Sequence, residues 1–358
     1  MEIHQVLVGA AFGDAITNEA IGLRAAIRAA FPGVASEIYA HHRQQNLPDI
    51  RPLSGYPARG ATDAVLVFHS SIGEAAVGEF LAARDERVVV RYHNITPPEF
   101  FQPYAPEFAE LLALGRRQLF GLRDRSALAI ADSGYNQQEL IDAGFKATVV
   151  VPIHADLAAL KAARSEPPKS YPLARHEDEP VVLFVGRVAP NKGHVRLMQS
   201  FHVLKTYRQY EAHLWMVGGA SQPLYSRLLD QYRRELGLTD TYFSGTVSVP
   251  ELAYVYRRAS VFLCLSEHEG FCVPLLEAMA FDVPIVALAR AAVPETLGGA
   301  GLLIDGYSPE VVAEAVSTVI DDAAVRQALV ERGRRRFAEL APERADEAFV
   351  AALRRVVA

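Results

Sequence analysis

The stretch VVLFVGRVAPNKG, residues 181–193, places an apolar run of strand length directly before a turn with two cations and a predicted helix. A strand followed by a helix is one unit of a parallel sheet. Further apolar runs alternate with amphipathic stretches after it, at residues 213–218, 242–244, 261–265, 284–287 and 302–304. Ser308 and Pro309 then predict the start of another helix. This half of the chain is therefore predicted to form a doubly wound sheet.

The amino half repeats the pattern. Strands are predicted at residues 5–10, 64–69, 87–92, 127–131 and 148–151, and helices near 18–30, 72–84, 106–123 and 136–143. Prolines gather among polar residues between about 155 and 180, which indicates a connection between two domains. We therefore expect an α/β protein with a first domain at 1–158, a linker at 159–180 and a second domain at 181–337.

The last segment, residues 338–358, is predicted to be a helix that returns to the first domain. Pro342 should break the helical stretch in front of it. Behind Pro342, apolar side chains recur at helical spacing, at residues 348, 349, 352, 353 and 356. Two sheets joined by one linker predict a deep cleft, and ligands of such sheets bind at the carboxyl ends of the strands.

Length and composition agree with a two-domain globular protein. The 358 residues exceed what one hydrophobic core usually serves. Half are hydrophobic and 22% are charged, and no apolar run approaches the ~18 residues that cross a bilayer. The start, with Glu2 and His4, lacks the pattern of a secretory signal, so a cytoplasmic location is expected. Cys264 and Cys272, the two cysteines, are too few for a disulfide framework or a zinc cluster.

The net charge argues against a nucleic-acid partner. The chain has 36 basic and 42 acidic residues, a formal charge of −6, whereas nucleic-acid binders carry a cationic surface. Arginines gather at two places, residues 116, 117, 123 and 125, and residues 332 and 334–336. We interpret these clusters as solvated helix faces. Peripheral contact with a membrane or an anionic acceptor is the open alternative.

Several reaction types lack their motifs. The sequence has no phosphate-binding loop of the Gly-Lys-Ser/Thr kind, no Gly-x-Gly-x-x-Gly after the first strand, no Gly-x-Ser-x-Gly and no His-Glu-x-x-His. It also has no Asp-x-Asp pair to hold a divalent cation on a nucleotide diphosphate. Phosphate charge would therefore have to be neutralised without a metal.

Two groups of residues carry chemistry in the carboxyl half. Gly186, Arg187 and Lys192 lie at a strand end beside a predicted helix N-terminus, where N–H groups and cations favour an anion. A solvated surface turn is the alternative. The second group follows the strand at 261–265, with Glu269 in a loop and Glu277 in the next helix. Two carboxylates so placed suit sugar hydroxyls, although Glu277 could also simply stabilise its helix N-terminus.

The second group has a recognisable pattern. Glu269 and Glu277 stand in Glu-Gly-Phe-x-x-Pro-x-x-Glu-Ala-Met, which resembles the signature of retaining GT-B glycosyltransferases of family 4. The segment Gly186–Gly193 resembles the diphosphate-binding turn of the same family. The resemblance covers the whole carboxyl half and is looser in the amino half. It implies the GT-B fold, with two doubly wound Rossmann-like domains facing a deep cleft, the first for the acceptor and the second for the nucleotide sugar.

The resemblance also implies a role for each matching residue. Arg187 and Lys192 would hold the diphosphate, and Glu277 the donor ribose. Glu269 would hold the transferred sugar together with the backbone of Gly270, Phe271, Cys272 and Val273. The thiol of Cys272 should pack as a small hydrophobic group.

In the amino half the resemblance rests on residues 131–133 with Asn136 and on residues 91–98. It implies that His93 lies beside the reacting carbon, although an isolated histidine after a strand often has a structural role. Gly13, Asp14 and Asn94 are candidates for a loop that contacts phosphate or acceptor, and the glycine loop at 9–15 departs from the common family form. The predicted catalytic residues are therefore His93, Glu269, Lys192 and Arg187.

The resemblance implies a hexosyltransferase that retains configuration by a front-face, metal-independent substitution. The donor would be a nucleotide sugar, with a UDP-sugar favoured and GDP-mannose second, and no cofactor is expected. The acceptor would be a carbohydrate, a lipid-linked molecule or a small molecule. A nucleotide-sugar epimerase and a non-catalytic nucleotide-sugar-binding subunit are the alternatives.

Overall fold

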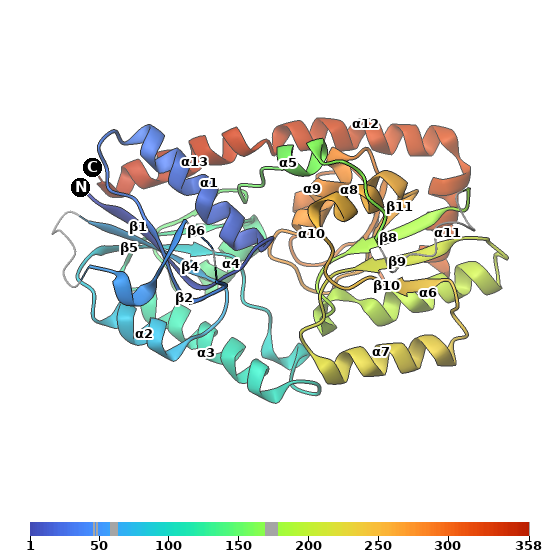
Figure 1. Cartoon of the computed structure of the whole chain (residues 1–358), viewed down its shortest axis with the longest axis horizontal. Helices are drawn as coiled ribbons and strands as arrows, with labels where there is room; N and C mark the ends of the chain where they lie inside the picture. Colours follow the sequence, from blue (N-terminus) through green and yellow to red (C-terminus); the bar gives the residue numbers. More distant parts are fainter. Residues whose placement is uncertain (46, 48, 58–63, 169–177, 358) are drawn as a thin grey trace. The chain divides into compact units, whose positions relative to one another are not determined.

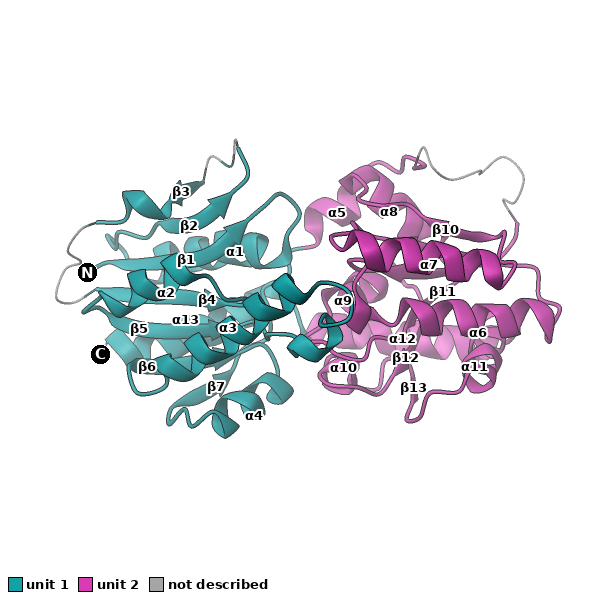
Figure 2. Ribbon diagram, turned by 90° about the horizontal axis from the view of Figure 1, so that it is seen from below, with its two compact units in different colours: residues 1–156, 340–358 teal, residues 157–339 magenta. Residues whose placement is uncertain are grey.

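The computed structural model describes residues 1–45, 47, 49–57, 64–168 and 178–357 and divides into two compact units (Figure 1). Unit 1 comprises residues 1–156 and 340–358, and unit 2 comprises residues 157–339 (Figure 2). The start of the expected linker is a short helix, α5 (Ala158–Ala162), which buries Leu160 within unit 2. Residues 169–177 of that linker lie outside the described residues.

Unit 1 is built on a parallel sheet with the order β3-β2-β1-β4-β5-β6-β7 in the described residues. Its strands are β1 (Ile3–Ala10), β2 (Ile38–Arg43), β3 (Ile50–Pro52), β4 (Val65–Ser70), β5 (Arg87–Tyr92), β6 (Ser126–Ala131) and β7 (Thr148–Val150). The sequence analysis did not predict β2 and β3. Each is buried only at its start and continues into exposed polar residues, so neither contains an apolar run of strand length.

Helices cover both faces of this sheet. Figure 1 shows α1 (Ala15–Ala30) and α13 (Pro342–Val357) on one face, and α2 (Ala75–Ala82) and α3 (Pro106–Leu122) on the other. Helix α4 (Gly134–Asp142) joins β6 to β7. Phe349 and Leu353 of α13 are fully buried in the core with Ile3 and Leu23. The carboxyl-terminal helix is therefore part of the core of unit 1.

Unit 2 has a second parallel sheet, with the order β10-β9-β8-β11-β12-β13 in the described residues. Its strands are β8 (Val181–Val185), β9 (His213–Val217), β10 (Thr241–Phe243), β11 (Val261–Cys264), β12 (Ile285–Leu288) and β13 (Leu302–Ile304). Its helices after α5 are α6 (His194–Thr206), α7 (Pro223–Glu235), α8 (Val249–Arg258), α9 (Val273–Ala280), α10 (Val293–Leu297), α11 (Pro309–Asp321) and α12 (Ala323–Glu339). The strands predicted for this half are all present, with ends shifted by a residue or less.

Local signals in the sequence account for several helix ends. Ser308 accepts a hydrogen bond from the backbone of Val311, so it caps α11 as predicted. The break expected near Pro342 lies between Glu339, where α12 ends, and Pro342, the first residue of α13. Among the described residues, no helix combines the length and the apolar character that a bilayer crossing requires.

The strand orders locate a switch point in each sheet. In unit 1, strands β1 to β3 follow one another toward one edge of the sheet, and strands β4 to β7 toward the other edge. In unit 2, the order changes direction in the same way between β8 and β11. Loops after such neighbouring strands diverge to opposite faces, which leaves room for a ligand at their carboxyl ends. The loops that the sequence analysis selected in the carboxyl half follow β8 and β11.

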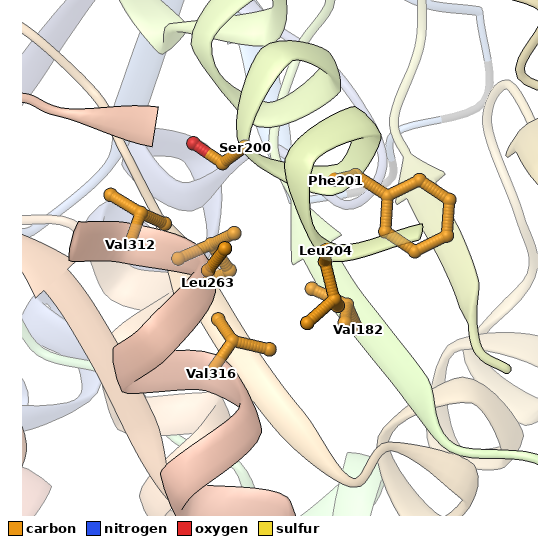
Figure 3. A pocket seen from close by; sticks show the side chains of 8 residues that line it. Val182, Ser200, Phe201, Leu204, Leu263, Val312 and Val316 are labelled. Atoms are coloured by element: carbon orange, nitrogen blue, oxygen red, sulfur yellow. The ribbon is translucent and has the colours of Figure 1, made fainter. Parts of the chain in front are cut away.

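A small cavity beneath α6 and α11 is a different kind of space (Figure 3). Its lining is apolar apart from the hydroxyl of Ser200, with Val182, Leu204, Leu263 and Val316 among the contributing side chains. A cavity that offers no charged group to a ligand is a packing defect of the core rather than a binding site. The search for a functional site therefore concentrates on the strand ends.

Candidate functional site

The loops after β8 and β11 are bonded to each other. The side-chain amide of Asn191 donates to the backbone oxygen of His268 at 3.0 Å, and the backbone N–H of Glu267 donates to the backbone oxygen of Asn191 at 2.8 Å. Asn191 belongs to the short 3₁₀ turn Pro190–Lys192, which precedes α6. The two groups predicted separately from the sequence therefore form one structure.

Gly193 permits this close approach. Its φ of 72° is left-handed, and a Cβ placed on it would lie 2.2 Å from the backbone oxygen of Leu265 in the other loop. A residue with a side chain would meet both a steric clash and an unfavourable backbone conformation. Glycine at this position thus fixes the N-terminus of α6 against the loop that follows β11.

Lys192 and Glu269 form the central ion pair of this region. The Lys192 ammonium donates to both carboxylate oxygens of Glu269 at 2.7 Å. Glu269 is only 8% exposed, so its charge requires this partner. The sequence analysis assigned Lys192 to phosphate and Glu269 to sugar, and the structure places the two groups in direct contact.

Arg187 lies at the end of β8 and is exposed. Within the part of the chain that the structure describes, it forms neither a hydrogen bond nor an ion pair. Gly186, directly before it, is bonded through its N–H to the backbone oxygen of Val217. The turn after β8 therefore presents one cation that is held by a carboxylate and one that is not.

Glu277 lies in α9, which begins at Val273. Its carboxylate is half-buried and accepts a hydrogen bond of 2.5 Å from the Tyr256 hydroxyl of α8. Burial raises the pKa of Glu277, and the bond from Tyr256 opposes this shift. Sequence reasoning gave Tyr256 no role, because nothing in the spacing of the two residues connects them.

The loop Gly270–Val273 joins Glu269 to α9. Cys272 occupies the residue before the helix with a left-handed φ of 73°, and its thiol packs in the apolar core. The backbone oxygen of Phe271 accepts a bond of 2.6 Å from the Thr296 hydroxyl of α10. Phe271 and Cys272, two of the residues predicted to contact a sugar, are thus held in place by the rest of unit 2.

His93 in unit 1 belongs to a buried polar network. It follows β5 directly, and its side chain is 2% exposed. Nδ1 lies 3.0 Å from Asp132 Oδ2, and Nε2 lies 2.8 Å from Nδ1 of His69. Both ring nitrogens therefore have partners inside the protein.

Two further charges complete this network. Arg91 of β5 pairs with Glu19 of α1 at 2.5 Å and with Asp132 at 2.9 Å, and all three side chains are buried. Glu19 also lies 3.4 Å from His93 Nε2. The two carboxylates require two positive charges to balance them in a buried site, and Arg91 supplies only one.

The directions of the hydrogen bonds identify the second positive charge. The amide nitrogen of Gln5 donates to the backbone oxygen of Ala20 at 2.9 Å, so its oxygen must accept from Nε2 of His69 at 2.8 Å. One proton then lies between the other nitrogen of His69 and Nε2 of His93, and the carboxylates of Glu19 and Asp132 beside His93 favour it on His93. Because His93 also donates to the carboxylate of Asp132, it carries both protons and is an imidazolium.

The pKa directions agree with this assignment. Burial alone would lower the pKa of His93, but the negative charges of Asp132 and Glu19 outweigh burial and raise it above the usual 6.5. Burial, together with the positive charges of His93 and Arg91, holds the pKa of His69 well below 6.5. These opposite shifts favour the positive charge on His93 rather than on His69.

The other residues proposed for the amino half have structural partners. Asn94 has a left-handed φ of 73° and donates to Asn136 at 2.9 Å and to Glu139 at 2.8 Å. Asp14 caps α1 by accepting from the backbone of Thr17 at 2.9 Å. Asp14 is exposed, as is Gly13, whereas the Asn94 side chain is buried.

Arginines of the two clusters noted in the sequence bond to protein acceptors. Arg116 bonds to Glu139 and to the backbone oxygen of Ile95, and Arg125 bonds to backbone oxygens of Leu81 and Arg84. In the second cluster, Arg334 pairs with Asp282, and Arg336 bonds to backbone oxygens near α10. Much of their charge is thus engaged within the fold.

Sequence reasoning missed His69, Glu19 and Gln5 as members of the network. A signal was present at one edge of the sheet: His69, His93 and Asp132 stand at or directly after the ends of the neighbouring strands β4, β5 and β6. Polar groups at adjacent strand ends meet at the same edge. Glu19 could not be found in this way, because it lies on a helix.

Comparison with known proteins agrees with this geometry. The family "Glycosyl transferases group 1" matches residues 167–336, which contain the loops after β8 and β11 and helix α9. The chain carries a group 1 glycosyltransferase domain. The glycosyltransferase signature read from Glu269 and Glu277 is thereby confirmed, while membership of family 4 and retention of configuration stay predictions.

Named glycosyltransferases are among the relatives of this chain. It is 33% identical over 251 residues to D-inositol 3-phosphate glycosyltransferase of Kineococcus radiotolerans, covering 65% of this chain and 57% of that protein. It is 26% identical over 263 residues to O-antigen chain mannosyltransferase B of Escherichia coli, covering 71% and 66%. The chain thus spans less than two thirds of the length of either relative.

Solved structures show the fold. Sucrose-phosphate synthase of Thermosynechococcus elongatus matches with a TM-score of 0.75 at 18% identity over 99% of both chains. The Anabaena protein Alr3699/HepE, solved with UDP and glucose, matches with a TM-score of 0.73 at 18% identity, again over 99% of both chains. The glycosyltransferase domain and the sheet of unit 1 thus belong to the GT-B fold, and the predicted α/β fold class is confirmed.

Proposed function

We propose that this protein transfers a sugar from a nucleotide-diphosphate donor to an acceptor hydroxyl, with retention of configuration and without a metal ion. The observation that carries the proposal is the Lys192–Glu269 pair at the switch point of unit 2, with Arg187 exposed in the same turn. Cations and carboxylates at one strand edge match the two parts of such a donor, an anionic diphosphate and a sugar rich in hydroxyls.

The diphosphate would bind at the turn after β8. Arg187 can offer two parallel N–H donors to phosphate oxygens, and the N-terminus of α6 adds the positive end of its dipole. Lys192 has three N–H donors and can keep a bond to Glu269 while it binds a phosphate oxygen. Partial release of the Glu269 carboxylate would then free an acceptor for sugar hydroxyls.

Glu277 would bind the donor ribose. Its half-buried carboxylate is held by Tyr256, which leaves acceptor capacity for hydroxyl groups. The backbone of Gly270, Phe271, Cys272 and Val273 would contact the transferred sugar. The neighbouring helix start at Val273 adds N–H groups without intrahelical partners.

The charged network around His93 supports a front-face mechanism. A double displacement needs a carboxylate nucleophile, and general base catalysis needs a group that can take the acceptor proton. Both ring nitrogens of His93 are engaged inside the protein, and Glu19 and Asp132 are bound to Arg91. We therefore assign the acceptor proton to the departing phosphate oxygen and give His93 a positioning role, with its positive charge fixed.

The positively charged groups of the same turn support metal independence. Arg187, Lys192 and the α6 N-terminus supply positive charge where a leaving diphosphate develops negative charge, and electrostatic groups of this kind stabilise a transition state strongly. Transfer in excess chelator tests this assignment. Activity that disappears in chelator and returns with magnesium or manganese would show that the phosphate charge is neutralised by an ion.

The donor is proposed to be a UDP-sugar, with GDP-mannose second. Support for uridine comes from the UDP and glucose named for the Anabaena structure, and support for mannose from the mannosyltransferase relative. The acceptor is a carbohydrate, a lipid-linked molecule or a small molecule, and peripheral contact with a membrane stays part of the proposal.

The decisive experiment combines binding and turnover. A thermal-shift screen of UDP-sugars and GDP-mannose selects the donor, and slow hydrolysis of that donor without acceptor is then measured for the parent protein and Lys192→Ala. Hydrolysis that depends on Lys192 supports a transferase. Binding without hydrolysis or transfer would indicate a non-catalytic subunit, and conversion of the donor to its epimer would indicate an epimerase.

A further inference from the structure

The chain has two cysteines among its 358 residues, and they are in contact. The Sγ atoms of Cys264 and Cys272 lie 3.9 Å apart, and both residues are buried. Cys264 is the last residue of β11, and Cys272 directly precedes α9. The eight-residue step between them contains the whole loop that carries Glu269.

Cys272 occupies its position at an energetic cost. Its φ of 73° is left-handed, a conformation that glycine adopts freely and that costs residues with a Cβ about 1–2 kcal/mol. Strained residues of this kind cluster at functional sites. Glycine at position 272 would avoid this cost. The presence of a cysteine there points to a use for its thiol.

We propose that Cys264 and Cys272 form a reversible disulfide that closes the loop carrying Glu269. Bond formation would bring the two sulfurs from 3.9 Å to about 2.05 Å. The end of β11 and the start of α9 are both held in the core of unit 2, so the loop at 265–271 must absorb most of this movement. The change would act directly on the Lys192–Glu269 pair.

The chemistry requires only a small oxidant, and we name hydrogen peroxide. Cys272, which is 7% exposed, is the more accessible thiol, and its reaction with peroxide gives a sulfenic acid and one water. Because the two sulfurs are in contact, Cys264 is placed to attack once Cys272 is oxidised. Its attack on the sulfenic sulfur forms the disulfide and releases hydroxide, which takes the Cys264 proton to become the second water.

A metal site is the competing use of the same atoms. A carboxylate oxygen of Glu269 and the two sulfurs lie within 4.8 Å of one another. However, both Glu269 oxygens are held by Lys192, so a metal would have to break that pair. The two thiols are already in contact while that pair is intact, and this favours the disulfide.

The test measures the thiols directly and uses the full chain. The protein is treated with hydrogen peroxide, denatured, alkylated and weighed, and the peptides that contain residues 264 and 272 are mapped. We expect a loss of two hydrogen atoms, no alkylation and a cross-linked peptide pair, all reversed by dithiothreitol. Cys264→Ser should give no cross-link and should instead gain oxygen at Cys272.

Two results would overturn the proposal. The first is a parent protein in which both thiols remain open to alkylation after peroxide, or in which Cys272 is over-oxidised without a cross-link. The second is stoichiometric zinc in the reduced protein by elemental analysis, lost in Cys264→Ser, which would assign the cluster to a metal.

The effect on ligand binding rests on the proposed function and has its own readout. Calorimetry with UDP and with GDP, on reduced and oxidised protein, should show about tenfold weaker binding after oxidation, equivalent to about 1.4 kcal/mol. Cys264→Ser should show no such change on peroxide treatment. If neither nucleotide binds the reduced protein, the proposed function fails, while the mass measurement still decides whether the disulfide forms.

Discussion

The two units present polar clusters at equivalent places, the carboxyl edges of their sheets, but the clusters differ in how fully their charges are satisfied. In unit 1, Glu19, Arg91, His93 and Asp132 balance one another, and the protons of the two histidines have defined partners. In unit 2, Lys192 and Glu269 hold each other in a less buried position, while Arg187 stands exposed beside them.

The difference separates two uses of charge. A buried network whose charges balance resists change, because removal of one partner leaves an uncompensated charge in a low-dielectric interior. A partly exposed pair beside a spare cation can exchange partners with a ligand at much lower cost. The cluster of unit 1 is therefore suited to hold a fixed geometry, and that of unit 2 to bind and release an anion.

The largest expected effect comes from the glycine that holds the unit 2 cluster together. Gly193→Ala should destabilise the protein by about 4 kcal/mol, because a left-handed conformation is combined with a clash against the Leu265 backbone. Gly237→Ala is the matched control, since Gly237 has a similar φ of 65° and open space around its Cβ position. It should cost about 1–2 kcal/mol in urea unfolding. Equal costs for the two variants would show that the close approach of the two loops is not tight.

The second prediction tests the locked cluster of unit 1 through pH. His93 has a raised pKa in the folded protein, so the stability it provides is fully present below its ordinary pKa of 6.5 and is lost as pH rises through the folded value. His93→Gln should therefore cost about 3 kcal/mol at pH 6, where two carboxylates keep a single cationic partner. The gap between the variant and the parent should narrow as pH increases.

Unfolding curves from pH 6 to pH 9 provide the measurement. His202→Gln, at a histidine of α6 outside the network, should leave the pH dependence unchanged. A cost of His93→Gln that is the same at every pH would mean that His93 is neutral and that the hydrogen-bond directions around His69 are wrong.

The third prediction concerns the exchangeable cluster. Lys192→Ala should lower transfer by about 100-fold, because it removes a charge that binds the leaving diphosphate more strongly as the bond breaks. Lys205→Ala is the control in α6, the helix that follows the turn with Lys192, and Lys205 pairs with Glu211 and Asp240. It should transfer sugar at the parent rate. A Lys192→Ala protein with normal transfer would leave Arg187 alone as the phosphate ligand.

The sequence predicted the parallel strands and the strand-end motifs because both are local. The apolar runs 181–185 and 261–265 are continuous, and glycine follows the first and serine the second. Strands β2 and β3 escaped detection because only the start of each is buried and apolar, and β3 lies at the edge of the sheet. Their position in the sheet is fixed by pairing with β1, which is not local information.

The residues of the site could be predicted from the sequence, but the contacts between them could not. Lys192 and Glu269 were both selected from the sequence, but their contact depends on Gly193 and Asn191, which bring two distant loops together. The charge state of His93 could not be predicted, since it follows from Gln5 and Glu19, which lie more than 70 residues away in the chain. Such long-range hydrogen-bond directions appear only in the folded protein.

The smallest expected effect sharpens the comparison within unit 2 itself. Glu277→Ala should weaken binding of UDP or GDP by about tenfold, because a hydrogen bond to a charged group contributes about 1.5–3 kcal/mol. Turnover at saturating donor should change little, since a ribose contact is nearly the same in the ground and transition states.

Tyr256→Phe is the matched variant that keeps the carboxylate and removes only its hydrogen-bond donor. Because burial raises the pKa of Glu277 and Tyr256 opposes that shift, the phenylalanine variant should have a still higher pKa at this carboxyl. Its affinity should therefore match the parent at high pH and fall as pH decreases through that raised pKa, whereas Glu277→Ala should be weak at every pH. Calorimetry across this range distinguishes the two patterns, and a Tyr256→Phe protein whose affinity is independent of pH would show that the ionised carboxylate of Glu277 is not what binds the ribose.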